Sequence, residues 1–123
     1  MTTYNCLPDH NRTAALTEAA AVLAAGKLVV MPTDTVYGIA CDAFNPAAVA
    51  ALLAAKHRGP DMPVPVLVGS WAAAEELAGD LPEPAVALMK AYWPGGLSVV
   101  VPQSSTVKSV SYTHLTLPTS DLV

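Results

Sequence analysis

Residues 29–43 read VVMPTDTVYGIACDA, and the interpretation of the whole chain starts from this stretch. The apolar run Val29–Met31 is typical of a buried strand, and Pro32 ends it because proline has no amide hydrogen for a strand ladder. The turn Thr33–Thr35 then places three hydrogen-bonding side chains next to one another. Such side chains can close a turn by bonding their own backbone, or they can face a ligand, so both interpretations stay open at this point.

Strands and helices alternate along the chain on both sides of this turn. Asn45 before Pro46 is a typical helix start, as is Ser70, and Gly26 is a typical helix end. Spacing of apolar residues predicts helices over 13–25, 47–56, 70–77 and 82–92, and strands over 27–31, 36–41, 64–68 and 97–101. The alternation predicts a layered α/β fold.

Composition limits the class of protein. With 123 residues, 53% hydrophobic and 13% charged, the chain is typical of one compact domain. Its net charge is −4 and its six basic residues are scattered, which argues against a surface that binds a long nucleic acid. Cys6 and Cys41 have no paired spacing, which favours free thiols in a reducing compartment. The N-terminus lacks the basic stretch of a secretory signal, so we predict a cytoplasmic protein that does not contact a membrane.

The stretch Pro32–Gly38, PTDTVYG, resembles the signature of the Sua5/YrdC family, the threonylcarbamoyl-AMP synthases. Three more blocks resemble the family in the same order, and they are Lys56-His57-Arg58, Asp61–Val68 and Trp93–Leu97. Together the blocks cover Leu16–Val101. The resemblance implies a three-layer, mixed, twisted sheet of the YrdC/RibB type, truncated at its C-terminal side.

The same resemblance implies an activity. ATP, L-threonine and bicarbonate would give L-threonylcarbamoyladenylate and pyrophosphate, in the first step of the N6-threonylcarbamoyladenosine (t6A) modification of tRNA. Mg²⁺ would accompany ATP, with no tightly bound cofactor. The product would pass to the tRNA threonylcarbamoyl-transferase machinery, and direct RNA binding is weakly supported.

Five residues are the predicted site. Lys56 and Arg58 are the candidate catalytic and ATP-binding residues, because displacement of pyrophosphate builds negative charge that cations stabilise. The resemblance implies that Thr35 contacts the threonine substrate, that Thr33 supports it and that Tyr37 lines the pocket. Without the resemblance, the two cations would be read as solvated helix-end residues and Tyr37 equally as a core aromatic. No residue is predicted to bind a metal.

Asp34 has only a supporting role, in which it holds either the turn or a bound cation, and His57 is expected to face away from its two neighbours. Two positions depart from the family pattern. Leu67 stands where many members have a histidine, and Met62 where many have a polar residue, so two substrate contacts are in doubt. The Ser-x-Asn element of the family is absent.

Residues 110–119, VSYTHLTLPT, resemble a translated sequencing adaptor. We therefore predict a partial YrdC-like domain over 1–109 and a non-native tail over 110–123 that covers no strand edge. We also predict that these 123 residues are inactive as a synthase, because half of the site is missing.

Two other functions remain open. The same fold serves as a carbamoyl-transferring module of hydrogenase-maturation proteins, and a YrdC-like protein could bind double-stranded RNA without synthase activity. The low basic content argues against RNA. A phosphate-binding loop of the ATPase type is excluded, because no glycine-rich Gly-Lys-Ser/Thr segment occurs.

Overall fold

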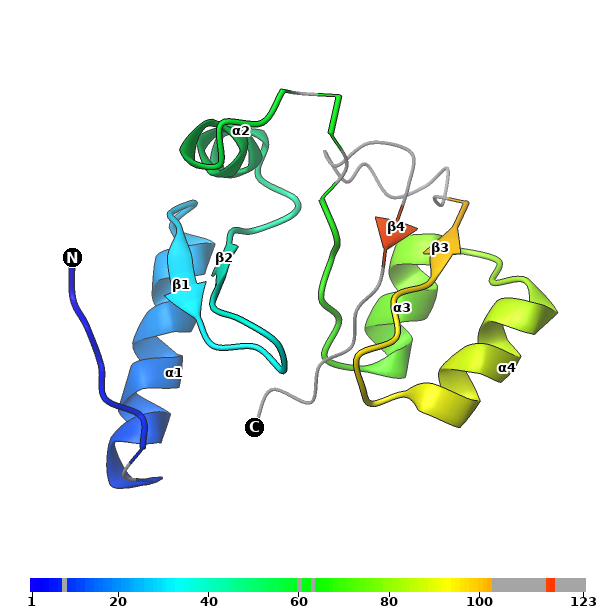
Figure 1. Ribbon diagram of the computed structural model, residues 1–123, viewed down its shortest axis with the longest axis horizontal. Coiled ribbons are helices and arrows are strands. Elements are labelled where there is room, and N and C mark those ends of the chain that lie inside the picture. The colour runs from blue at the N-terminus through cyan, green and yellow to red at the C-terminus, as the bar shows by residue number, and fades with distance from the viewer. Residues whose placement is uncertain (8, 60, 63, 103–114, 117–123) are drawn as a thin grey trace.

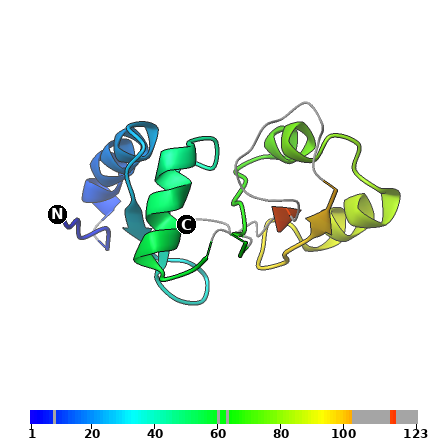
Figure 2. The same cartoon turned by 90° about the horizontal axis from the view of Figure 1, so that it is seen from above.

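The computed structural model describes residues 1–7, 9–59, 61–62, 64–102 and 115–116. In these ranges helices and short strands alternate, which confirms the predicted α/β class (Figure 1). The order is α1 (Asp9–Ala24), β1 (Val29–Met31), β2 (Gly38–Ala40), α2 (Pro46–Ala55), α3 (Trp71–Ala78), α4 (Glu83–Tyr92), β3 (Val100–Val101) and β4 (Leu115–Thr116). Figures 1 and 2 show these elements in two groups, with α1, β1, β2 and α2 in one and α3, α4, β3 and β4 in the other.

The N-terminal group is built on a hairpin. β1 and β2 pair antiparallel with Val30 opposite Ile39 and Met31 opposite Gly38, so residues 32–37 form the connecting loop. Gly38 brings the backbone close to the start of this loop, since a Cβ there would lie 3.3 Å from Thr33 Cγ2. α1 lies alongside β1. The register thus places the polar loop at one end of the hairpin.

α2 begins at a well-formed cap. Asn45 Oδ1 accepts hydrogen bonds from the amides of Ala47 and Ala48, both at 3.1 Å, and satisfies donors that have no partner within the helix. The Asn45 side chain also lies against Gly26, where a Cβ would be 2.6 Å from Nδ2. Gly26 has a φ of +74°, which glycine adopts without a steric penalty. The end of α1 and the start of α2 are therefore fixed by one contact.

The C-terminal group contains the larger core. α3 is capped by Ser70, whose Oγ accepts a 3.2 Å hydrogen bond from the amide of Ala73. β3 pairs antiparallel with β4, with Val101 opposite Leu115. The buried cluster consists of Val66, Val68, Ala74, Leu77, Ala78, Ala85, Met89, Val99 and Val101. Val99 and Val101 in this cluster attach the segment that follows α4 to the same core as α3 and α4.

The predicted helices are confirmed and the predicted strands are partly wrong. α1 begins four residues before the expected start at 13, and β1, β2 and β3 are shorter than predicted. Residues 64–68 form no strand, although Val66 and Val68 are buried and Leu67 is exposed. The alternation of apolar and polar residues predicts which side chains face a core. A strand also needs a neighbouring strand whose backbone it can pair with, and the alternation does not supply that.

The prediction that the tail covers no strand edge was wrong for Leu115–Thr116. These residues form β4 and pair with β3. Backbone groups pair whatever the side chains are, so a polar composition did not exclude this ladder. In the described part of the chain, no helix is long and apolar enough to cross a membrane.

We expect the substitution Asn45→Ala to lower the free energy of unfolding by about 1 kcal/mol, because two helix amides lose their acceptor. Asn45→Asp, which keeps an acceptor oxygen in place, is the matched control and should lose much less. Urea denaturation followed by circular dichroism measures both variants. Equal losses in the two variants would show that the cap hydrogen bonds do not stabilise α2.

Candidate functional site

The loop 32–37 is organised by one hydroxyl group. Thr33 Oγ1 accepts hydrogen bonds from the amides of Thr35 and Val36, each at 3.2 Å, and donates to the carbonyl of Val36 at 2.5 Å. A hydroxyl has one hydrogen and two lone pairs, so these contacts use its full capacity. Thr33 is thereby a structural residue of the loop.

Thr35 differs from Thr33 because its hydroxyl keeps unused hydrogen-bonding capacity. Its Oγ1 lies 3.3 Å from Thr33 Oγ1, and among the described residues its side chain forms no hydrogen bond to any other residue. The three hydrogen bonds of Thr33 already use its hydrogen and both lone pairs, so this oxygen–oxygen approach leaves the hydrogen and both lone pairs of the Thr35 hydroxyl available. Thr35 is also exposed. It can accept hydrogen bonds from a ligand while the loop keeps its shape.

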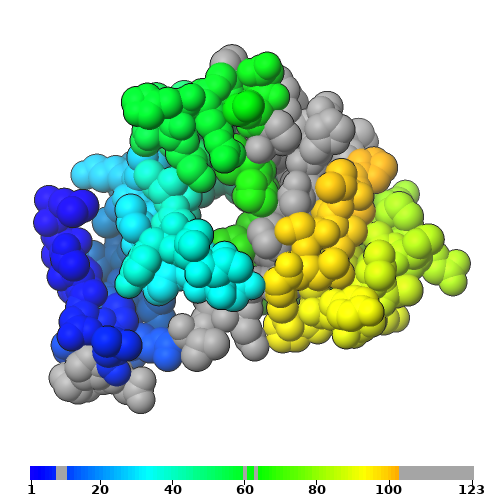
Figure 3. Space-filling view, viewed as in Figure 1, coloured from blue at the N-terminus to red at the C-terminus, as the bar shows by residue number. Residues whose placement is uncertain are grey.

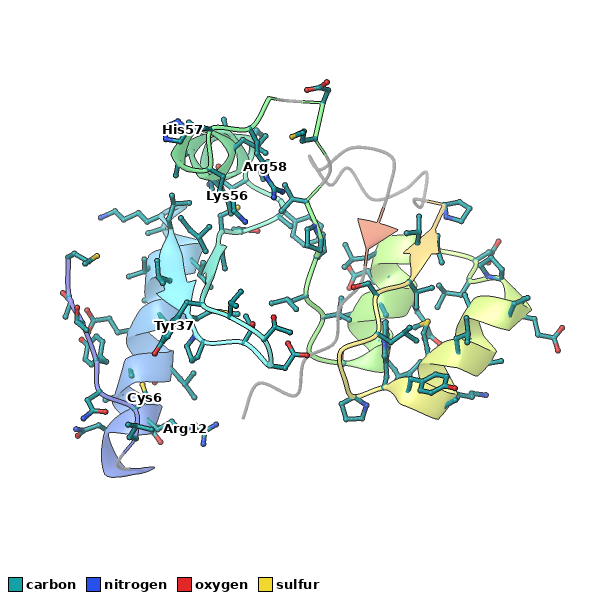
Figure 4. All side chains as sticks on the ribbon, viewed as in Figure 1. Cys6, Arg12, Tyr37, Lys56, His57 and Arg58 are labelled. Atoms are coloured by element: carbon teal, nitrogen blue, oxygen red, sulfur yellow. The ribbon has the colours of Figure 1, made fainter. Side chains whose placement is uncertain are left out.

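Tyr37 is not a core residue. Its side chain is 76% exposed, so the alternative interpretation as a core aromatic was wrong. In Figure 4 it lies well away from Lys56 and Arg58. The structure therefore puts Tyr37 at the exposed end of the loop, next to β2, and away from the two cations.

Lys56, His57 and Arg58 lie at the C-terminal end of α2. The amide of His57 donates to Ala54 O at 3.0 Å and the amide of Arg58 donates to Leu53 O at 2.9 Å. With a φ of 53° at His57, this is a Schellman ending with histidine in the left-handed position usually taken by glycine. In Figure 4 His57 points away from the other two side chains, as expected.

The loop and the cations border one depression. Figure 3 shows the surface hollowed at its centre between the cyan hairpin with its loop and the green segment after α2, and we call this the central hollow. In Figure 4 Lys56 and Arg58 extend from the end of α2 toward it. The loop that carries Thr33 and Thr35 borders it on the opposite side. The structure thus brings the two predicted groups to the border of one hollow.

The turn 93–97 is fixed from within the C-terminal core. Trp93 Nε1 donates to Leu97 O at 2.9 Å, which closes the turn, and the Trp93 ring lies 5.8 Å from that of Trp71. Gly96 lies against Asp34, since a Cβ on Gly96 would be 2.7 Å from Asp34 Oδ2. Sequence reasoning missed this contact, because nothing in the local pattern joins residues so far apart in the chain.

The two departures from the family pattern are on the surface. Leu67 is 37% exposed and Met62 51% exposed, so neither is held in the core. Among the described residues no three His, Cys, Asp or Glu side chains gather as metal ligands.

Cys41 lies in an environment that favours the protonated thiol. Burial raises the pKa of its thiol, and the negative charge of Asp42 raises it further. A thiol with a raised pKa stays protonated near neutral pH, and the thiolate is the reactive form.

Comparison with known proteins adds independent findings. The family profile described as "Telomere recombination", for Sua5, YciO and YrdC proteins, matches residues 21–118. A Mycobacterium leprae protein is 56% identical over 98 residues, and a Mycobacterium tuberculosis protein is 52% identical over 106 residues. Both are named provisionally as threonylcarbamoyl-AMP synthases. These matches cover 80% and 86% of this chain but 44% and 49% of the relatives, so the chain spans about half of their length.

A solved structure agrees with the sequence relatives. The crystal structure of P. abyssi Sua5 complexed with L-threonine superposes with a TM-score of 0.75 at 37% identity. The superposition covers 81% of this chain and 30% of that protein. The fold similarity therefore extends over most of the described residues.

We expect His57→Gly to raise the free energy of unfolding by about 1 kcal/mol, because the left-handed conformation strains a residue with a Cβ. His57→Ala keeps the Cβ and should bring no gain. Urea denaturation of the three proteins measures the difference. A loss of stability in the glycine variant would mean that the imidazole itself holds the end of α2.

Proposed function

Because this chain belongs to the Sua5/YciO/YrdC family, we propose that it supplies part of the active site of an L-threonylcarbamoyladenylate synthase. The observation that carries the proposal is the arrangement around the central hollow. A loop with an available threonine hydroxyl lies on one side, and two cations point in from the other. The P. abyssi Sua5 protein crystallised as a complex with L-threonine, and this supports an amino-acid substrate.

L-Threonine is a small zwitterion with one hydroxyl, so its pocket needs a few fixed hydrogen-bonding groups. We assign the contact to Thr35, because its oxygen keeps both lone pairs for the substrate's ammonium or hydroxyl hydrogens. Thr33 maintains the loop through its saturated hydroxyl. Tyr37, exposed next to the loop, would be a rim residue of the same pocket.

The proposed reaction forms two bonds. The amino nitrogen of threonine bonds to the carbon of bicarbonate with loss of water, and a carboxylate oxygen of that product bonds to the α-phosphorus of ATP. Pyrophosphate leaves, and the negative charge that develops on it needs positive groups nearby. Lys56 and Arg58 bring positive charge to the central hollow. Mg²⁺ accompanying ATP would add further positive charge, held chiefly by the nucleotide's own phosphates.

The proposal extends to the compartment and to the step that follows the reaction. The two cysteines carry no disulfide, as suits a reducing compartment such as the cytoplasm. A net charge of −4 gives little attraction for a tRNA backbone, so the adenylate would be handed on to a separate tRNA-modifying machinery. Half of the relatives' length lies outside this chain, so binding is a sharper test of this site than turnover.

Lys56→Ala and Arg58→Ala should each weaken ATP binding about tenfold, because each removes a charge-assisted contact to phosphate. Binding of L-threonine should stay within about twofold, since neither cation lies on the loop. Isothermal titration with each ligand separately gives both constants. Lys90→Ala, which removes the basic residue in the last turn of α4, is the matched control and should change neither. Loss of ATP affinity in the control alone, or unchanged affinity in both test variants, would contradict the assignment.

Thr35→Val should weaken L-threonine binding about fivefold or more and leave ATP binding unchanged, because it removes one hydroxyl at nearly constant volume. Thr35→Ser restores the hydroxyl and should recover most of the affinity. The same titrations measure these variants. If valine binds L-threonine as tightly as the parent, Thr35 is a residue of loop structure and not of substrate recognition.

A further inference from the structure

Asp34 makes a contact that the proposed chemistry does not use. It stands between the two loop threonines, and its carboxylate reaches across to Gly96 in the other group of elements. A Cβ on Gly96 would lie 2.7 Å from Asp34 Oδ2 and 4.0 Å from Cγ. The loop of the hairpin and the turn 93–97 therefore meet at this point, although most of the described chain separates them in sequence.

The two sides of this contact differ in how firmly they are held. Trp93 and Leu97 pack against the buried cluster of the C-terminal group, and the hydrogen bond between them closes the turn that contains Gly96. The loop residues Asp34 and Thr35 are exposed, and the hydrogen bonds described for the loop lie within the loop itself. The turn is thus the rigid partner, and the loop is the part that gains from being held.

We infer that Asp34 is a positioning residue, which holds the loop against the 93–97 turn and so fixes the Thr35 hydroxyl for an amino-acid ligand. The inference rests on the proposed function of Thr35. A binding group that is already in place does not lose conformational freedom when the ligand arrives, and this increases affinity. A role for Asp34 in holding a cation has less support, since no cluster of metal ligands occurs among the described residues.

The glycine at position 96 is explained by the same contact. The left-handed φ values of described glycines occur at Gly26 and Gly79, so the backbone of Gly96 would accept alanine. The atom that the added methyl group meets is the end of a short, exposed side chain, which can rotate away. Gly96→Ala should therefore displace the Asp34 carboxylate without unfolding the protein.

The test compares Asp34→Ala, Gly96→Ala and the double variant with the parent chain. Gly69→Ala is the matched control, because a Cβ at Gly69 meets nothing within 4 Å. Asp34→Asn keeps the shape of the side chain and removes its charge. The first measurement needs no ligand, and it is the rate at which the Thr35 and Val36 amides exchange with water, followed by NMR. The second is the dissociation constant of L-threonine, from isothermal titration.

We expect Asp34→Ala and Gly96→Ala each to speed exchange of both amides and to weaken L-threonine binding about fivefold, as for residues that share one contact. The double variant should be no worse than either single variant, while Gly69→Ala and Asp34→Asn should stay within about twofold of the parent. Unchanged exchange in both single variants, or effects that multiply in the double variant, would overturn the inference. So would a loss in Asp34→Asn as large as in Asp34→Ala, which would indicate a role for the charge. A parent chain that binds no L-threonine would count against the proposed function, while the exchange rates would still decide whether Asp34 holds the loop.

Discussion

The candidate site depends on the hydrogen bonds that the Thr33 hydroxyl makes within the loop. This hydroxyl closes the loop after β1 by accepting from two amides and donating to one carbonyl, and it has no capacity left for a ligand. This saturation separates the roles of two identical side chains in one short loop. Thr33 gives the loop its shape, and Thr35 is left exposed with its acceptor capacity intact. A flexible polar loop could not make that distinction, because its hydroxyls would exchange partners.

The cations are oriented by a different local device. α2 ends in a Schellman motif, in which the left-handed His57 reverses the chain direction and sends its own side chain away from its neighbours. The side chains of Lys56 and Arg58 extend toward the central hollow. A helix end with glycine would be less strained, so the histidine carries a conformational penalty whose compensation is not evident in the described contacts. Both sides of the site are thus shaped by hydrogen bonds to the backbone, from a side chain in the loop and from backbone amides at the end of α2, and these bonds set where the functional side chains lie.

Two small cores support these elements. The N-terminal group buries Ala15, Ala48, Val49, Leu52 and Leu53, and the C-terminal group has the larger cluster around Met89. Asn45 against Gly26 fixes two helices within the first group, and Asp34 against Gly96 joins the two groups. Both contacts pair a polar side chain with a glycine, because a Cβ would occupy the space that the side chain needs. The loop of the candidate site therefore lies where the two groups meet.

The sequence by itself determined the α/β class, the four helices, their caps at Asn45 and Ser70, and the two segments that carry the candidate residues. These features depend on side chains close together in the chain, such as a cap and the amides two or three residues later. The tertiary structure alone decided that residues 64–68 pair with no described strand, that Leu115–Thr116 pairs with β3, and that Tyr37 is exposed. It also decided that Asp34 meets Gly96. Strand pairing and long-range contacts depend on which distant backbone lies alongside, and a local pattern of residue types does not contain that information.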